Sequence, residues 1–203
     1  MNAIADLAAL RAHMGEISAL AERKVLPRLD GHGRNFIALS PFLVIATADR
    51  DGRVDASPRG DPPGFVQVLD DSTLLLPDRP GNNRVDSFGN VLSSPGIGLI
   101  FFVPGIDETF RVNGRASLSA DPAALDGMAV NGRPPKTGLL IQVEECFFHC
   151  AKALKRARLW DPAAQVERQA FPSLGRILSE QIDLMSVDDA EARIEAGYRD
   201  RMY

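Results

Sequence analysis

The segment PFLVIATADRDGRVDASPRGD, residues 41–61, has the sequence pattern of paired strands. An apolar run from Phe42 to Ala48 meets the polar sequence DRDG, and a second extended run returns after it. Two runs of this kind separated by a short Gly-containing turn are typical of a β-hairpin. The sequence therefore predicts two antiparallel strands joined by a tight turn.

The same pattern recurs along the chain. Residues 64–77 combine a strand, an Asp-Asp-Ser turn and a second strand, residues 96–103 and 108–119 are two strands joined through PGID, and residues 137–149 begin a further long strand. Strands and helices do not alternate, which excludes a doubly wound nucleotide fold. Six or seven strands joined mostly by hairpins predict a mainly β fold with peripheral helices, whose antiparallel sheet is closed or nearly closed into a barrel.

Helices are predicted outside these strands. Residues 3–26 carry apolar side chains at spacings of three and four, which predicts one amphipathic helix ending at Pro27 and the sequence DGHG. Short helices are expected at residues 84–94 and 121–130, and a helical tail at about residues 163–200. Without a repeat or a clear linker, we expect one domain over residues 1–203.

Composition excludes several classes of protein. The formal net charge of −4 argues against a nucleic-acid binder. No apolar run approaches the ~20 residues that span a bilayer, so we expect no membrane association. The N-terminus lacks a basic leader before an apolar block, and two cysteines are too few for a disulfide framework. We therefore expect a cytoplasmic protein.

The segment LLLPDRPGNNRVDSFGN, residues 74–90, concentrates hydrogen-bond donors in one loop. Arg79 and Arg84 bring guanidinium forks, and Asn82 and Asn83 bring amides, around a Pro-Gly turn. This composition indicates that an anion is bound. The segment is neither a P-loop nor a Rossmann glycine signature, so side chains and loop amides would hold it.

Further polar residues lie at other strand ends. Thr109, Arg111 and Asn113 alternate along one strand and share a face unless a bulge intervenes. If that face meets the loop at residues 79–84, these side chains surround a phosphate; otherwise they are solvated strand charges, which spacing alone favours.

Histidines and cysteines give a weak signal. His13 is expected on the surface of the first helix, and His32 lies in a Gly-flanked turn where it is either a plain loop histidine or a ligand contact. Cys146 and Cys150 share strand parity while His149 points the other way, which favours buried thiols over a zinc site. We expect no metal. Since no dedicated acid/base pair is evident, a cofactor is expected to carry any chemistry.

The order of the motifs SPRGD, PDRPGNNR, RVNG and HCAK, between about residues 30 and 160, resembles the pyridoxamine 5′-phosphate oxidase-like flavoproteins, within them a predicted flavin-nucleotide-binding subgroup. The resemblance implies a split β-barrel that forms a homodimer with two FMN sites at the subunit interface. It also implies a set of cofactor-binding residues: Ser57, Pro58, Arg59, Pro77, Asp78, Arg79, Asn82, Asn83 and Arg84, with Arg111, Lys152 and Arg156 as second-tier contacts. Lys152 or Arg156 would come from the partner chain.

The function that follows from this resemblance is FMN-dependent oxidoreduction, in which a small-molecule substrate or a reduced nicotinamide donor passes a hydride to the flavin. Two alternatives stay open: a non-catalytic flavin-binding or flavin-sequestering protein, and the same barrel binding haem or a deazaflavin. Trp160 is followed by DPAAQ and an acidic tail, and no substrate-binding set for vitamin B6 can be mapped. Pyridoxamine phosphate oxidation is therefore expected to be weak or absent.

Overall fold

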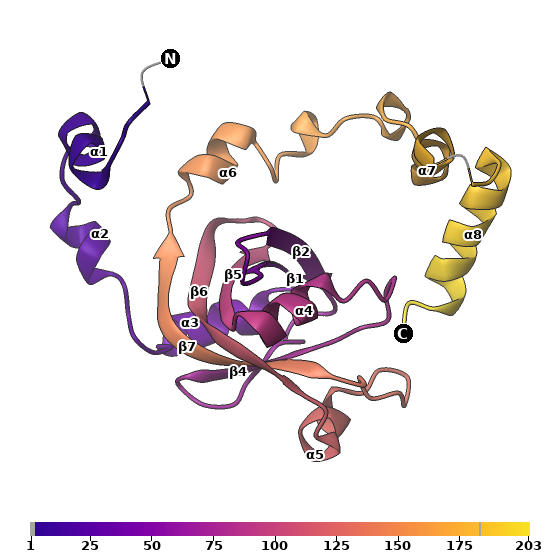
Figure 1. The fold of residues 1–203 in the computed structure, drawn as a ribbon, viewed down its shortest axis with the longest axis horizontal. Helices are drawn as coiled ribbons and strands as arrows, with labels where there is room; N and C mark the ends of the chain where they lie inside the picture. The colour runs from indigo at the N-terminus through magenta and orange to yellow at the C-terminus, as the bar shows by residue number, and fades with distance from the viewer. Residues whose placement is uncertain (1–2, 183) are drawn as a thin grey trace.

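The structure is a computed structural model that describes residues 3–182 and 184–203. Its centre is a seven-stranded sheet in the order β2-β1-β5-β6-β7-β4-β3 (Figure 1). Each adjacent pair is antiparallel, which confirms the predicted hairpins and the mainly β fold. The strands are β1 (Phe42–Ala48), β2 (Val54–Gly60), β3 (Gln67–Val68), β4 (Thr73–Pro77), β5 (Gly96–Val103), β6 (Ile106–Ser119) and β7 (Gly138–His149).

Helices surround this sheet, as predicted. α4 and α5 lie where short helices were expected, and α7 and α8 form the helical tail. The α-helices are α1 (Leu7–Met14), α2 (Ala19–Arg23), α3 (Gly31–Leu39), α4 (Asp86–Ser93), α5 (Pro122–Leu125), α6 (Lys152–Ala157), α7 (Leu174–Ile182) and α8 (Val187–Asp200). Three 3-10 turns are η1 (Asp126–Met128), η2 (Pro162–Ala164) and η3 (Arg168–Ala170).

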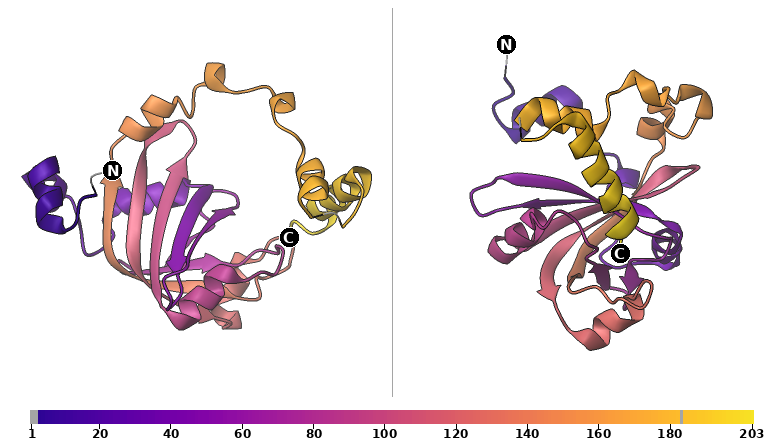
Figure 2. Two further views of the ribbon diagram at one scale, coloured as in Figure 1. Left: turned by 45° about the horizontal axis from the view of Figure 1, so that its top comes forward. Right: turned by 90° about the vertical axis from the view of Figure 1, so that its right-hand side faces the viewer.

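The sheet is strongly curved but not closed. β6 and β7 wrap around the core (Figure 2), while β2 and β3 end the strand order at opposite edges. The expected closed or nearly closed barrel is therefore an open, split one. Asn113 pairs with Glu145 but Gly114 pairs with Val143, so β7 carries one extra residue there. Such a bulge bends the strand and increases its twist.

The core lies on the concave face of the sheet. Leu43 and Ile45 of β1 and Phe101 of β5 are fully buried there. α3 adds Phe36 and Ile37 to this core, and α4 adds Val91. Burial of this apolar area is the main term that stabilises the fold and fixes the position of α4 against β1 and β2.

The segment DGHG begins a helix instead of forming a turn. Asp30 is the N-cap of α3, and its Oδ1 accepts a hydrogen bond from the Gly33 amide at 2.7 Å. Asp is among the preferred N-cap residues, so the capping residue was present in the predicted turn. His32 consequently lies in the first turn of α3, with its side chain exposed.

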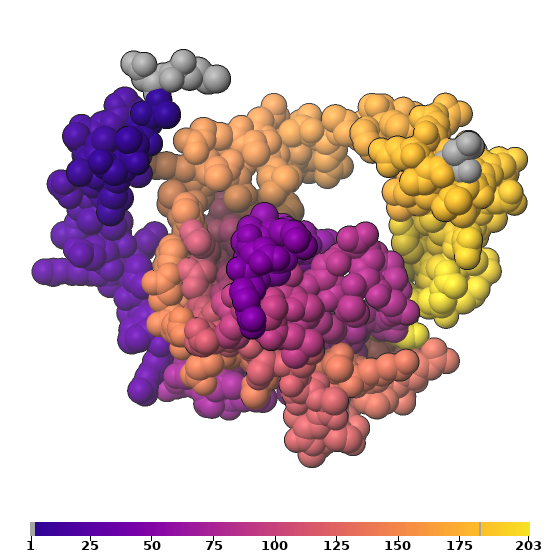
Figure 3. Space-filling model, viewed as in Figure 1, coloured from indigo at the N-terminus to yellow at the C-terminus, as the bar shows by residue number. Residues whose placement is uncertain are grey.

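The prediction of one continuous helix over residues 3–26 is wrong. The chain forms α1 and α2, and Gly15 ends α1 with a φ of +84°. Glycine adopts this left-handed conformation without a Cβ penalty. Neither helix has a buried residue, and Figure 3 shows both projecting from one side of the molecule.

The C-terminal tail passes over the sheet through α6 and returns as the hairpin of α7 and α8 (Figure 1). Gly175 lets the two helices approach closely, because a Cβ there would lie 2.4 Å from Cγ of Glu191. Position 183, inside the predicted tail, lies outside the described residues. Among the described residues, no helix is both long enough and apolar enough to cross a membrane.

Candidate functional site

A cavity of about 450 Å³ lies between β2, the end of β4, the loop at residues 78–85 and the start of α4. The structure brings together in its wall nine of the twelve residues predicted to bind the cofactor. They are Ser57, Pro58, Arg59, Pro77, Asp78, Arg79, Asn82, Asn83 and Arg84. Residues 57–59 and 77–84 are adjacent in space because the curved sheet places β2 and the end of β4 around the same opening.

Arg59 is the principal cation of the cavity. Its Nη1 donates to the Pro58 carbonyl at 2.8 Å and to Ser57 Oγ, and its Nη2 lies 3.5 Å from Ser87 Oγ. Among the described residues it makes no ion pair within 4 Å. Burial lowers the pKa of Arg59, and the charges of Asp78 and Asp55 oppose that shift. Arg59 is thus a partly desolvated cation positioned by a strand.

The N-terminus of α4 also faces the cavity, because Val85, Asp86, Ser87 and Phe88 line it. Val85 is the N-cap with a φ of 53°, and no side chain caps the first turn. This left-handed conformation is uncommon for a β-branched residue and stores strain where the loop enters the helix. Uncapped amides and the helix dipole make such a terminus suitable for an anion.

The Arg79 guanidinium is hydrogen-bonded to other parts of the protein. Its Nε donates to Asp61 Oδ2 at 2.6 Å, and its Nη1 donates to the Met128 carbonyl at 2.9 Å. Asp61 is almost fully buried, with a side chain only 1% exposed. It also accepts a hydrogen bond of 2.8 Å from the Tyr203 hydroxyl. Arg79 therefore ties the loop to the segment after β2 and to the C-terminal tail.

Arg84 and the two asparagines shape the mouth of the cavity. Arg84 is exposed and pairs with Asp86 at 2.7 Å. Asn82 Oδ1 accepts a hydrogen bond from the Arg84 amide at 3.0 Å, and Asn83 has a φ of 57°. Asparagine bonds locally to the backbone and tolerates the left-handed region better than most residues. These amides thus organise the loop itself.

Asp78 is the acidic counterpart of Arg59 in the wall. Burial raises its pKa, while the charges of Arg59 and Arg79 and a hydrogen bond from the Arg79 amide act in the opposite direction. Asp55 lies at the cavity as well and accepts a hydrogen bond of 2.6 Å from Ser87 Oγ. Acidic and basic groups therefore alternate around the opening.

The remaining three predicted residues do not line this cavity. Arg111 lies over the Phe147 ring, with Cζ 5.1 Å from the ring centroid. Lys152 and Arg156 belong to α6, which Figure 1 shows beyond the end of β7 and apart from α4. Their arrival from a partner chain stays a prediction. Arg111 pairs with Ile100, Ile100 with Val44, and Val44 with Pro58. Because paired side chains share a face and neighbours along a strand alternate, Arg111 lies on the face of the sheet opposite to Ser57 and Arg59.

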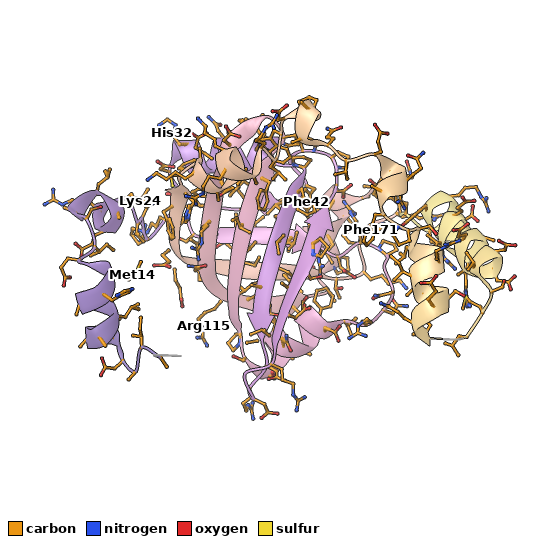
Figure 4. The ribbon with its side chains drawn as sticks, turned by 90° about the horizontal axis from the view of Figure 1, so that it is seen from above. Met14, Lys24, His32, Phe42, Arg115 and Phe171 are labelled. Carbon is orange, nitrogen blue, oxygen red and sulfur yellow. The ribbon has the colours of Figure 1, made fainter. Side chains whose placement is uncertain are left out.

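The histidines and cysteines lie away from the cavity. His32 is on the outside of the molecule (Figure 4), and His13 and His149 are exposed. Cys146 is buried and donates to the Arg28 carbonyl at 3.2 Å, and burial raises its pKa to about 11. Cys150 is exposed, so the expectation of two buried thiols is wrong for this residue. It follows β7 rather than lying within it.

Several site residues were missed by sequence reasoning, among them Ser87, Phe65 and Asp61. Ser87 and Phe65 line the cavity, and Asp61 fixes Arg79. The helix predicted at residues 84–94 begins at Asp86 in the structure, after Val85, so its uncapped start could not be read from the sequence. An uncapped helix start beside an arginine-rich loop indicates an anion site.

The wall of the cavity suits a phosphorylated planar cofactor such as FMN. Arg59, the Ser57 and Ser87 hydroxyls and the amides at the start of α4 are donors for phosphate oxygens. Pro58, Pro77, Phe65 and Phe88 supply apolar surface for a ring system. The residues present therefore fit both ends of this group.

Comparisons with known proteins cover the same region. The model of the family described as pyridoxamine 5′-phosphate oxidase matches residues 29–150. This range contains the whole sheet and every residue that lines the cavity, and it excludes α1, α2 and the tail. No curated protein matches the chain.

Solved structures are similar to part of the chain. HupZ of Group A Streptococcus is 19% identical over 59% of this chain and 93% of its own, with a TM-score of 0.48. A candidate pyridoxamine 5′-phosphate oxidase of Lactobacillus delbrueckii is 21% identical over 60% of this chain and 95% of its own, with a TM-score of 0.47. An FMN-binding protein of Syntrophomonas wolfei is 16% identical over 58% of this chain and 83% of its own, also with a TM-score of 0.47.

Proposed function

The chain belongs to the pyridoxamine 5′-phosphate oxidase family, and from this premise we propose that its cavity holds FMN and that the protein is an FMN-dependent oxidoreductase. One observation carries the proposal. Arg59, a half-buried cation without an ion-pair partner among the described residues, lies in the same cavity as the uncapped start of α4. This combination favours a phosphate over a neutral ligand.

Different residues of the cavity would hold the two ends of the cofactor. Arg59 and the α4 amides would hold the phosphate, with Ser57 and Ser87 as further donors. Pro58 and Phe65 would exclude water from the ring. Bound FMN supplies a two-electron acceptor for a hydride, so the protein itself has to bind, orient and desolvate. The hydride would come from a small-molecule substrate or a reduced nicotinamide.

The assembly that would complete the site is a homodimer. Phe42 on β1 is 40% exposed on the convex face of the sheet (Figure 4), with its ring centroid 6.0 Å from that of Phe102 on β5. An exposed phenylalanine beside a half-buried one on a sheet face favours association, and most soluble homo-oligomers are C2 dimers. Light scattering should give twice the chain mass at micromolar concentration, and a flavin-loaded monomer would contradict this part of the proposal.

The decisive experiment is the absorbance spectrum of the purified protein, followed by anaerobic addition of NADH or NADPH. Flavin bands that bleach on addition support the oxidoreductase. A bound flavin that stays oxidised with these donors and with pyridoxamine phosphate favours a flavin-binding protein without redox turnover. A haem or deazaflavin spectrum would overturn the assignment of FMN.

A matched pair of variants connects this experiment to the cavity. Arg59→Gln should weaken FMN by roughly 10- to 150-fold, because a hydrogen bond to a charged group contributes about 1.5–3 kcal/mol. Arg53→Gln removes the same charge from the exposed turn between β1 and β2, outside the cavity, and should leave FMN affinity unchanged. Equal affinities of the two variants would show that FMN phosphate binds elsewhere.

A further inference from the structure

A second cavity of about 440 Å³ lies behind the loop that lines the first one. Its wall comes from three segments far apart in sequence: the loop at residues 78–83, residues 133–136 and residues 200–203. Asp78, Arg79, Pro80, Gly81 and Asn83 line both cavities, so this loop is a shared partition. Residues 200–203 lie outside the region that matches the family.

Basic side chains predominate in this cavity although the chain as a whole is acidic. Lys136 and Arg201 line it, and among the described residues neither has an ion-pair partner. Arg133 also lines it, and its Nη1 donates to the main-chain oxygen of Tyr203 at 3.1 Å. With a formal net charge of −4, unpaired cations converging on one cavity are not explained by composition.

The acidic residues of the wall are offset locally. Asp200 pairs with Arg199 at 2.9 Å, on the rim of the cavity. Asp78 interacts with the charges of Arg59 and Arg79. The positive charges of Lys136 and Arg201 are therefore available to a ligand in the cavity.

The rest of the wall is apolar and held in place. Pro80, Pro134 and Pro135 line it together with Tyr203. The Tyr203 hydroxyl donates to Asp61 at 2.8 Å, and its ring lies 5.9 Å from the Arg79 guanidinium carbon. Because Tyr203 is held at both its hydroxyl and its main-chain oxygen, its ring forms a preorganised surface, which reduces the entropy lost on binding.

From this arrangement we propose that the second cavity binds a small aromatic anion, with its phosphate or carboxylate at Lys136 and Arg201 and its ring against Tyr203 and the prolines. Unpaired cations select the charge of the ligand, and the flat apolar wall selects its shape. The inference rests on the proposed function only in assigning the first cavity to FMN. Binding to the second cavity is a property of residues 133–136 and 200–203 and can be measured with or without flavin.

The test uses phenyl phosphate as the probe, titrated calorimetrically into the full chain, both FMN-saturated and flavin-free. Arg201→Gln and Lys136→Gln should each weaken the probe by roughly tenfold or more. Both side chains are exposed, so the variants should unfold at the wild-type urea concentration. Arg193→Gln is the matched control, because Arg193 is an exposed arginine of α8, the helix that Arg201 follows, and does not line the cavity. Its affinity for the probe should equal that of the wild type.

Two results would overturn the inference. One is a probe affinity that Arg201→Gln and Lys136→Gln leave unchanged. The other is a probe that binds only flavin-free protein and is lost in Arg59→Gln, since it would then occupy the first cavity. Failure of the proposed function looks different: FMN would not bind, while the dependence of the probe on Lys136 and Arg201 would persist.

Discussion

Replacing Arg79 by alanine tests whether this arginine stabilises the fold or binds the ligand. Arg79 and Asp61 form an ion pair whose side chains are 18% and 1% exposed. Removing one partner of a buried pair costs about 3–5 kcal/mol, because the other charge stays buried and uncompensated. Asp61 keeps the hydrogen bond from Tyr203, so we expect the lower end, about 3 kcal/mol.

The assay is equilibrium unfolding in urea. With a slope of about 2–3 kcal/mol per molar, reasonable for a chain of this size, a loss of about 3 kcal/mol lowers the midpoint by about 1–1.5 M. Under native conditions FMN affinity should change only a few-fold, since the Arg79 fork is turned toward Asp61 and the Met128 carbonyl. The two measurements together distinguish damage to the loop from loss of a ligand contact.

A double variant supplies the control for this prediction. Arg79→Ala combined with Asp61→Asn removes the buried charge as well as its partner, and should recover at least about half of the lost stability because a neutral amide costs less to bury than a carboxylate. If Arg79→Ala unfolds at the wild-type urea concentration yet loses FMN strongly, Arg79 is a phosphate ligand and the structural assignment is wrong.

Three further predictions concern single positions. Arg84→Ala should weaken FMN by less than about tenfold and leave riboflavin unaffected, because Arg84 is exposed and screened by solvent; equal losses for both ligands would place Arg84 in the loop architecture instead. Gly114→Ala should lower the urea midpoint clearly, since its Cβ would lie 2.0 Å from the Gln142 carbonyl oxygen, whereas Gly96→Ala has open space and should not. A thiol reagent at pH 8 should modify Cys150 quickly and Cys146 only on unfolding, because burial raises the Cys146 pKa to about 11; two fast thiols would contradict this.

The strands and their pairing were predictable because their signal is local. In β1 and β5 alternate side chains are buried, and the turns between paired strands are short. A hairpin with a short turn fixes its own register, so no information from distant residues is required.

The wrong predictions of helix bounds each depend on a single residue. The apolar spacing over residues 3–26 continues across Gly15, but the positive φ of that residue ends α1. Asp30 and the glycines beside it suggested a turn, yet the carboxylate caps α3. In both cases composition was ambiguous between a turn and a helix end.

The sequence motifs predicted residues that lie around one cavity, but not what each of them contacts. Nine of the predicted residues line one cavity, since the curved sheet brings β2 and the end of β4 to the same opening although they are far apart in the strand order. Which arginine is available to a ligand depends on Asp61, Tyr203 and Met128, which are distant from the loop in sequence. No spacing rule connects these residues, so the pairing of Arg79 could not be deduced.

The two loop arginines therefore have different capacities to respond to a ligand, although both flank the same Pro-Gly turn. The Arg84–Asp86 pair is exposed and contributes little, so an arriving phosphate can replace Asp86 as the partner of Arg84 at small cost. The Arg79–Asp61 pair is buried and cannot be exchanged without leaving Asp61 unsatisfied. Arg59, on a strand and without a carboxylate partner among the described residues, needs no exchange at all. From these three environments we expect the largest loss of FMN affinity at Arg59 and a smaller one at Arg84. Replacing Arg79 should instead lower the stability of the fold.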